Sequence, residues 1–433
     1  MVAKFEWERR KFLHRKPLMR LLDLRLCLLA ATLVLSGLSV LHSLSSTQIR
    51  LTSEQDYRRL SFIATVRPQT EDADHKPPAY FRPGALWVDT DGVPIQAHGG
   101  GVMEHNGMYY WYGEDKNGET FKPWSIIAEG AARVEVIGIR CYSSHDLANW
   151  QNEGLALQAE QHQDLAKSMV VERPKVIYND LTQQFVMWMH IDDARYKKAS
   201  IGVAVSGRPM GPFQYLRSSR PHGQESRDMT LFKDEDGSAY VVYSSNGNKD
   251  LHIGRLSRDY TNVVGDYRKA IVGDSREAPA LFKHADQYYM VTSGCTGWDA
   301  NKALIHTAGN IMGDWALLGN PCLGESEMEA AQTFGAQSTF VLPVPGGPGR
   351  FIFMADQWNP EDLRSSRYTW LPLWVLDGDE ESLDRDGPSS LETAESSVVT
   401  VLVQWQELWR LSDLEQPSWD AAALSNATSQ KAA

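Results

Sequence analysis

The sequence contains little cysteine, and the spacing of these residues excludes one common kind of site. Cysteine accounts for 4 of the 433 residues, and no two cysteines have the Cys-x-x-Cys spacing of structural zinc sites. Cys27 belongs to an apolar run near the amino end, so Cys141, Cys295 and Cys322 remain for the rest of the chain. A zinc-stabilised domain is therefore not expected.

Positive charge is also in deficit. The chain has 43 Lys and Arg against 55 Asp and Glu, which gives a net charge of -12. This charge would repel a phosphate backbone, which argues against a nucleic-acid partner. Asp89 to Gly92 lack the rest of an EF-hand calcium loop, and Gly99 to Gly101 are not followed by a helix that could cradle phosphate. Many Trp and Tyr residues together with carboxylates suit a carbohydrate ligand better.

A basic segment and then an uncharged apolar run, Leu26 to Leu41, stand at the amino end. Residues 1–25 are predicted to be a cytoplasmic tail, residues 26–44 a signal anchor and residues 45–78 a stem. A cleaved signal peptide is the alternative for the apolar run. The chain is thus expected to be a single-pass type II membrane protein facing the Golgi or ER lumen, or a secreted protein. Residues 415–433 are expected to be a flexible tail carrying one glycosylation sequon, at Asn426.

Residues 79–414 contain five copies of one hairpin pattern, which begin near residues 96, 172, 226, 275 and 335. Each copy has a polar residue, a short apolar run, a turn and a second apolar and aromatic run. A unit this small cannot bury its own apolar face, so five copies predict an all-β fold, the five-bladed β-propeller. A more polar pair of outer strands follows each hairpin, and residues 399–411 are expected to return and close the ring.

Cys295 and Cys322 flank the outer strands of the repeat that begins near residue 275. In an oxidising lumen a disulfide between them is expected, and it would stabilise the fold by roughly 3 kcal/mol. Two buried thiols are the alternative.

The polar residues that open the hairpins form a candidate site. Aligning the hairpins on their apolar runs brings one residue of each copy into register: His98, Arg173, Arg227, Glu277 and Gln337, with Glu172 and Asp228 beside them. In a propeller these residues point at one axis. Two carboxylates facing one pocket are the minimum for glycoside hydrolysis, so Glu277 and Glu172 are the leading pair. A salt bridge from Glu172 to Arg173 or Arg227 that only joins blades is the structural alternative.

At this point the residues resemble a known family, glycoside hydrolase family 43, and within it the exo-β-1,3-galactanase branch. The resemblance runs from about Pro83 to Leu411 and rests on several motifs. They are WVDTDGVPIQAHGGG, YYWYGEDK, CYSSHDLANW, VVERPKVIYN, SRDMTLFKDEDG, REAPALF, SGCTGW and FGAQSTFVLP. The sequence departs from its relatives at SSNGNKD (244–250) and MADQW (354–358), which bears on substrate length and linkage.

The resemblance implies a five-bladed propeller that removes galactose with inversion, and it assigns three catalytic residues. Glu277 is implied to be the general acid, and Glu172 the carboxylate that tunes and orients it. The first blade carries no aspartate base, as in the galactanase branch, so Gln337 takes the base position as an imidic tautomer. By ordinary chemistry a glutamine would only position water or bind sugar.

Other residues are expected to bind the sugar. Trp298 resembles a pocket residue whose ring stacks on a pyranose, and core packing is its alternative. The remaining substrate-binding candidates are His98, Arg173, Glu114, Asp228, Asp356 and Trp358. No cofactor and no metal ligand set is predicted, although a structural calcium on the axis could use His98 and Asp228.

Three functions are consistent with the sequence. The leading one is an inverting exo-galactosidase acting on β-1,3-galactan of a polysaccharide or glycoprotein. The second is a family 43 glycosidase for arabinosyl, xylosyl or other galactosyl linkages. The third is a membrane-anchored lectin-like propeller, which would have no use for the acid Glu277. The protein is expected to be a monomer, attached to the membrane only through its amino-terminal segment.

Overall fold

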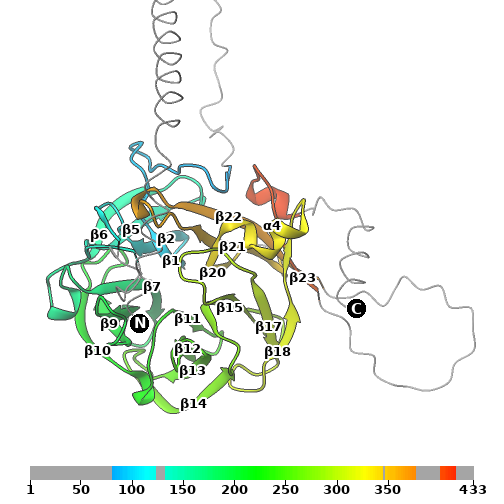
Figure 1. The fold of residues 1–433 in the computed structure, drawn as a ribbon. Coiled ribbons are helices and arrows are strands. Elements are labelled where there is room, and N and C mark those ends of the chain that lie inside the picture. Colours follow the sequence, from blue (N-terminus) through cyan, green and yellow to red (C-terminus); the bar gives the residue numbers. More distant parts are fainter. Residues whose placement is uncertain (1–79, 123–131, 345–346, 377–399, 416–433) are drawn as a thin grey trace, which may run out of the picture. The chain divides into compact units, whose positions relative to one another are not determined.

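The computed structural model of the chain describes residues 80–122, 132–344, 347–376 and 400–415. They form five β-sheets arranged as blades around a centre (Figure 1). In the first four blades the strands are antiparallel neighbours in chain order, and the fifth has one extra strand. The predicted all-β, five-bladed propeller is confirmed.

Each blade begins with its innermost strand. The first blade contains β1 (His98–His105), β2 (Met108–Glu114), β5 (Gly138–Ser144) and β6 (Gln151–Gln158). The second contains β7 (Val170–Asn179), β8 (Gln184–Asp192), β9 (Ser200–Ser206) and β10 (Gln214–Ser219). The third contains β11 (Met229–Lys233), β12 (Ala239–Ser245), β13 (Asp250–Leu256) and β14 (Val263–Ile271).

The last two blades follow the same plan. The fourth contains β15 (Arg276–His284), β16 (Gln287–Gly294), β17 (Leu304–Ala308) and β18 (Ala316–Gly319). The fifth contains β20 (Gln337–Pro343), β21 (Arg350–Gln357), β22 (Arg367–Leu376), β23 (Thr400–Gln404) and β19 (Cys322–Leu323). The short helix α4 (Glu327–Ala331) precedes β20, and β3 (Thr120–Phe121) pairs with β4 (Arg133–Val134) outside the blades.

The inner strands β1, β7, β11, β15 and β20 form a closed ring, each in contact with the next. The apolar core is divided among the blade interfaces. One cluster, for example, joins Tyr112 of the first blade to Met187 of the second, and another joins Tyr289 of the fourth to Phe353 of the fifth. Because both faces of each sheet are covered by its neighbours, the strands carry nearly continuous apolar runs.

A β-bulge opens the inner strands of three blades at the same position. In β1, β7 and β15 the three residues that follow His98, Glu172 and Glu277, respectively, lie opposite only two residues of the neighbouring strand. The residue that follows has a positive φ in each case: Gly99, Arg173 and Ala278. Glu172 is therefore the structural equivalent of Glu277. The predicted register, which placed Arg173 there, is wrong by one residue, because it aligned Tyr178 with Phe282, whereas Ile177 is the equivalent residue of β7.

The two ends of the described chain meet and close the ring. The backbones of Phe81 and Trp409 exchange hydrogen bonds of 2.7 and 3.1 Å, and their rings stack with centroids 4.3 Å apart. Both side chains belong to the aromatic cluster between the fifth and first blades, and β23 adds to the fifth blade. The returning carboxyl-terminal segment closes the ring as expected.

The predicted Cys295–Cys322 disulfide is wrong. Cys141, Cys295 and Cys322 are all free thiols. Cys295 follows β16 of the fourth blade, whereas Cys322 lies in β19, which pairs with β23 of the fifth. The sulfur of Cys295 instead donates to the carbonyl of Ser275 at 3.1 Å. The two cysteines thus belong to different sheets, which the spacing in the sequence could not show.

The predicted cytoplasmic tail, signal anchor, stem and flexible tail with Asn426 lie outside the described residues. Within the part of the chain that the structure describes, no helix is both long and apolar enough to cross a membrane.

Candidate active site

A pocket of about 230 Å³ lies where the inner strands begin. It brings together strand residues of the first, second, fourth and fifth blades and loop residues that include Asn248 of the third blade. Its lining consists of Glu114, Glu172, Arg173, His190, Tyr196, Arg227, Asp228, Asn248, Glu277, Gly297, Trp298, Gln337 and Trp358. Of the ten predicted site residues, eight line this pocket, and His98 and Asp356 do not.

Glu277 is the carboxyl group best suited to hold a proton. Its side chain is buried and accepts hydrogen bonds from the amides of Gln337 (3.1 Å) and Asn248 (3.2 Å). Burial, and then the negative charge of Asp228, raise the pKa of Glu277 to about 8, although Arg173 opposes the shift. At neutral pH this group is therefore largely protonated, as a general acid must be.

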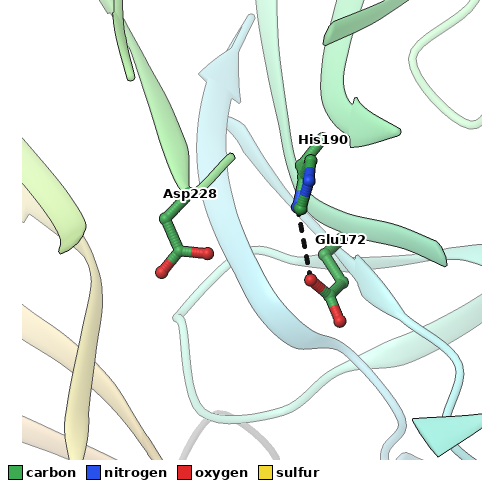
Figure 2. Close-up of side chains that lie close together, drawn as sticks. All are labelled: Glu172, His190 and Asp228. Atoms are coloured by element: carbon green, nitrogen blue, oxygen red, sulfur yellow. Dashed lines mark ion pairs between the residues drawn. The ribbon is translucent and has the colours of Figure 1, made fainter. Parts of the chain in front are cut away.

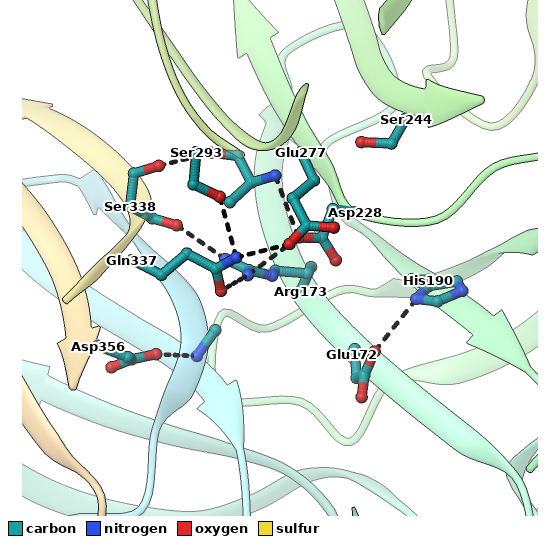
Figure 3. A network of polar contacts seen from close by, with 12 residues as sticks. Glu172, Arg173, His190, Asp228, Ser244, Glu277, Ser293, Gln337, Ser338 and Asp356 are labelled. Atoms are coloured by element: carbon teal, nitrogen blue, oxygen red, sulfur yellow. Dashed lines mark hydrogen bonds and ion pairs between the residues drawn. The ribbon is translucent and has the colours of Figure 1, made fainter. Parts of the chain in front are cut away.

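Gln337 stands at the centre of the network (Figure 3). Its Oε1 accepts from the guanidinium of Arg173 at 2.5 Å and from the indole of Trp358 at 3.0 Å. Its Nε2 donates to Glu277 at 3.1 Å and to the hydroxyl of Ser293 at 3.0 Å. These four bonds fix which end of the amide is oxygen and which is nitrogen.

Arg173 ties the carboxylates and the amide together. Its guanidinium donates to the carbonyl of Ser338 at 2.8 Å and pairs with Asp228 at 3.0 Å, in addition to its bond with Gln337. Asp228 also accepts from the backbone N–H of Ala278 at 3.1 Å. Arg173 therefore binds Asp228 and Gln337. The structural alternative for Glu172, a salt bridge to Arg173, is not formed.

Glu172 has partners of its own. Its carboxylate pairs with His190 Nδ1 at 3.3 Å and accepts from the hydroxyl of Tyr196 at 2.9 Å. Burial would raise the pKa of Glu172, but His190 and Lys116 outweigh it and lower the value to about 2. His190 in turn binds Asp192 at 2.9 Å, and the two carboxylates outweigh burial and raise its pKa to about 9. The result is a fixed ionic chain along one wall of the pocket.

Glu114 closes the pocket beside this chain. Its carboxylate pairs with Lys116 at 2.6 Å and accepts from the backbone N–H of Arg173 at 2.9 Å. Burial raises the pKa of Glu114 in spite of Lys116. The same carboxylate lies against Gly99, where a Cβ would come within 2.2 Å of Oε1, so only glycine fits at that position of the first bulge.

Two tryptophans form the aromatic side of the pocket. The rings of Trp298 and Trp358 meet edge to face, with centroids 4.9 Å apart. Trp358 is held by its bond to Gln337, while the indole Nε1 of Trp298 is buried without a hydrogen-bond partner. Trp298 therefore combines an apolar face with an unused donor, the pair of properties that a sugar ring and its hydroxyls require.

His98 and Asp356 lie below the pocket and are fully buried. Asp356 accepts from the backbone N–H of Gly99 at 2.5 Å and faces His98 Nδ1 at 3.6 Å. His98 stacks on Tyr368 with ring centroids 4.8 Å apart. The structure thus places both residues under the first bulge, where they support it.

Comparisons with known proteins agree with this geometry. The profile of glycosyl hydrolases family 43 matches residues 102–355. A family 43 β-1,3-galactosidase solved with galactodeoxynojirimycin shares 37% sequence identity and a TM-score of 0.65, with 76% of this chain and 100% of that chain covered. A second family 43 β-1,3-galactosidase shares 33% identity and a TM-score of 0.66. The match covers 78% of this chain and 65% of that chain, so this chain spans slightly less than two thirds of that relative.

The exo-β-1,3-galactanase of Phanerochaete chrysosporium, solved with β-1,3-galactotriose, shares 32% identity and a TM-score of 0.62, with 77% of this chain and 68% of that chain covered. A search of curated proteins found no match. The chain belongs to glycosyl hydrolase family 43. It is accordingly a glycosidase.

The donor set of this family 43 glycosidase does not suit a cation in the pocket. The ligand atoms of Glu172, His190 and Asp228 lie within 4.8 Å of one another (Figure 2). However, the raised pKa of His190 keeps its imidazole protonated, and Asp228 already pairs with Arg173. A protonated imidazole cannot donate a lone pair to a metal. His98, the other predicted calcium ligand, faces Asp356 and Tyr368.

The prediction missed several residues of this glycosidase site, among them His190, Tyr196 and Asn248. His190 could have been found, because it lies directly opposite Glu172 in the β7–β8 hairpin. The corresponding cross-strand residues of the first and fourth blades, Glu114 opposite His98 and Ser293 opposite Glu277, also belong to the site network. Tyr196 and Asn248 lie in loops, and no pattern in the sequence marks them. Asn248 has a positive φ of 61° that aims its amide at Glu277.

Proposed function

We propose that this family 43 glycosidase is an exo-acting galactan 1,3-β-galactosidase that removes galactose from β-1,3-galactan with inversion. The observation that carries the proposal is the hydrogen-bonded set of Glu277, Gln337 and Arg173 at the base of a small pocket. A volume of about 230 Å³ is below the ~300–1,000 Å³ of pockets for drug-sized ligands and suits a single sugar at a chain end. The solved relatives named above are β-1,3-galactosidases and an exo-β-1,3-galactanase.

Glu277 acts as the general acid in this proposal. Its raised pKa keeps the proton that the glycosidic oxygen needs as the bond to the anomeric carbon breaks. Each of the remaining pocket carboxylates is already engaged with a cation: Glu172 with His190, Asp228 with Arg173, and Glu114 with Lys116.

Gln337 is then left to activate water. The N–H groups of Arg173 and Trp358 both point at Oε1 and draw electron density onto that oxygen. An ordinary amide nitrogen is not a base, so this role requires the imidic tautomer, in which Oε1 carries a proton and Nε2 keeps an in-plane lone pair that can accept the water proton. Asp89 and Asp91 of the first blade are not alternatives, since Asp89 accepts from the backbone of Asp91 and Val93 in a turn away from the pocket.

The protons balance within this pair. Glu277 gives its proton to the departing oxygen, the water oxygen bonds to the anomeric carbon, and Gln337 takes the water proton on nitrogen. The 3.1 Å hydrogen bond from Gln337 Nε2 to Glu277 Oε1 is the path by which a proton returns to Glu277. Both residues therefore end the cycle as they began it.

The test is to incubate the purified protein with β-1,3-galactan, β-1,4-galactan, arabinan and xylan and to identify the first products. Galactose from β-1,3-galactan alone, seen first as the α-anomer by proton NMR, is the expected result. Release of arabinose or xylose would move the enzyme to another specificity. Early oligosaccharides would contradict exo action, and early β-galactose would contradict inversion.

Replacing Gln337 with alanine tests the base. Because water attack is needed whichever group leaves, Gln337→Ala is expected to abolish turnover of both galactan and an activated aryl galactoside. Azide, which needs no base, is expected to restore part of the aryl galactoside cleavage as α-galactosyl azide. Gln214→Ala, an exposed change on β10, is the matched control. A Gln337→Ala enzyme with most of its rate would remove Gln337 from the mechanism.

A further inference from the structure

Lys175 is a buried cation that the mechanism above does not use. It lies on β7, three residues after Glu172, and its side chain is 2% exposed. Its Nζ donates to the carbonyl of Gly99 at 2.9 Å and approaches the carbonyl of Arg173 at 3.5 Å. Among the ion pairs of the described residues, none includes Lys175. Burial, and then the charge of Arg173, lower the pKa of Lys175 to about 7.

The ring of inner strands is shaped around this side chain. A Cβ on Gly101 of β1 would lie 2.7 Å from Cδ of Lys175 and 3.1 Å from the ring of Phe340 of β20. The stem of Lys175 therefore fills the space between three inner strands, and glycine is needed opposite it. A second cavity, of about 420 Å³, is lined by Lys175 and by the later residues of all five inner strands. Lys175 stands at the head of that cavity, next to the catalytic pocket.

The two carbonyls that Lys175 contacts belong to the bulges that build the site. Gly99 and Arg173 are the positive-φ residues of the first and second blades. The N–H of Gly99 is held by Asp356, the N–H of Arg173 is held by Glu114, and the Arg173 guanidinium holds Gln337. A shift of either bulge would move the guanidinium that orients Gln337.

We propose that Lys175 is a positioning residue, whose ammonium group provides a positive charge at the centre of the propeller. It binds the backbone carbonyls of Gly99 and Arg173 and so holds the first and second bulges together. The guanidinium of Arg173 is thereby kept where it binds Gln337 and Asp228. The expected change in kcat rests on the proposed function, whereas the expected change in melting temperature does not. Carbonyl groups that converge on the centre of the ring present negative ends of dipoles, and a buried cation balances them. Lys175 supplies that charge from within the chain.

The first measurement compares Lys175→Met with the wild type at pH 6, where the amine is protonated. Methionine keeps the volume and removes the charge, and replacing a buried charge by an apolar group is often neutral for stability. We expect a fold that melts close to the wild type, a kcat lower by at least about tenfold and a KM changed by less than about twofold. Lys233→Met is the control and should keep its kcat. Lys233 also lines the second cavity, but it is partly exposed and pairs with the exposed Asp180.

The second measurement adds n-propylammonium or 1-propanol to Lys175→Ala. If the charge matters, propylammonium raises both the melting temperature and kcat, and the neutral alcohol of similar shape does neither. Equal effects of the two additives would reduce Lys175 to a space-filling residue and overturn the proposal. A Lys175→Met enzyme with wild-type kcat would also overturn it. If the wild type released no galactose, the proposed function would fail. The melting temperatures of Lys175→Ala with propylammonium and with 1-propanol would still show whether the charge of Lys175 matters.

Discussion

Glu277 and Glu172 occupy equivalent positions at the bulges of two blades, yet their pKa values are shifted in opposite directions. Glu277 is buried, accepts from the amides of Gln337 and Asn248 and lies near the negative charge of Asp228, so its pKa rises to about 8. Glu172 has His190 and Tyr196, so its pKa falls to about 2. One backbone geometry thus yields a proton donor and a fixed anion, and the partners alone make the difference.

Glu277→Gln should keep the shape of the site and remove its acid. We expect the rate on galactan to fall by roughly 100- to 10,000-fold, the usual range for loss of a general acid. The loss should be much smaller for an aryl galactoside whose leaving group needs little protonation. Steady-state kinetics on the two substrates would show this difference. Equal losses on both would mean that Glu277 does not protonate the leaving group.

Asp228→Asn should move the pH dependence of the reaction. As the proposed general acid, Glu277 must be protonated to act, so kcat/KM should decline as the pH rises through about 8. The negative charge of Asp228 raises that pKa, and the neutral amide should therefore shift the alkaline decline to lower pH. The exposed Asp236→Asn should leave the profile unchanged. An unmoved profile in Asp228→Asn would show that burial alone sets the pKa of Glu277.

At the scale of strands, the sequence predicts the hairpins and the convergence of their first residues, because apolar periodicity reports which strands are buried. It does not predict the bulges. An extra residue on β7 turns Glu172 toward His190 and Arg173 toward Gln337, and nothing in the apolar pattern marks that residue. The loop residues Tyr196 and Asn248 were missed for the same reason, since loop conformation is set by tertiary contacts.

The β7–β8 pair should make stability depend on pH through His190. Its folded pKa of about 9 exceeds the ordinary 6.5, so its contribution is complete below about pH 6.5 and is lost as the pH rises through 9. The lowered pKa of Glu172 means that its contribution to the free energy of unfolding is present above pH 4.5 and is lost as the pH falls toward 2. Denaturant unfolding at a series of pH values should therefore show His190→Gln most destabilised between about pH 5 and 6.5, with the gap closing toward pH 9.

The exposed His145→Gln provides the comparison for this series. It should unfold like the wild type at every pH. A constant gap between His190→Gln and the wild type would mean that the imidazole contributes packing and no charge.

At the scale of the whole molecule, stability depends on closing the ring, since the first and fifth blades each expose an apolar face until the ends meet. Closure was predictable from the apolar and aromatic character of residues 399–411. Its chemistry was not, because Phe81 and Trp409 lie far apart in sequence. The structure shows that the contact between blades five and one is the most aromatic of the interfaces, with Trp111, Trp150, Trp370 and Trp409 in one cluster.

Trp409→Ala should therefore destabilise the entire propeller and not only its last segment. Trp409 is fully buried, stacks on Phe81 and donates its indole N–H to the carbonyl of Trp370 at 2.8 Å. Removing it should lower the free energy of unfolding by about 3–5 kcal/mol, the usual cost of a large aromatic truncated in a core. The neighbouring Leu408 is exposed, so Leu408→Ala should have little effect. Because the ring is expected to unfold as one unit, fluorescence and loss of glycosidase activity should follow the same denaturant curve in Trp409→Ala. Separate curves would show that the first and fifth blades open without the rest.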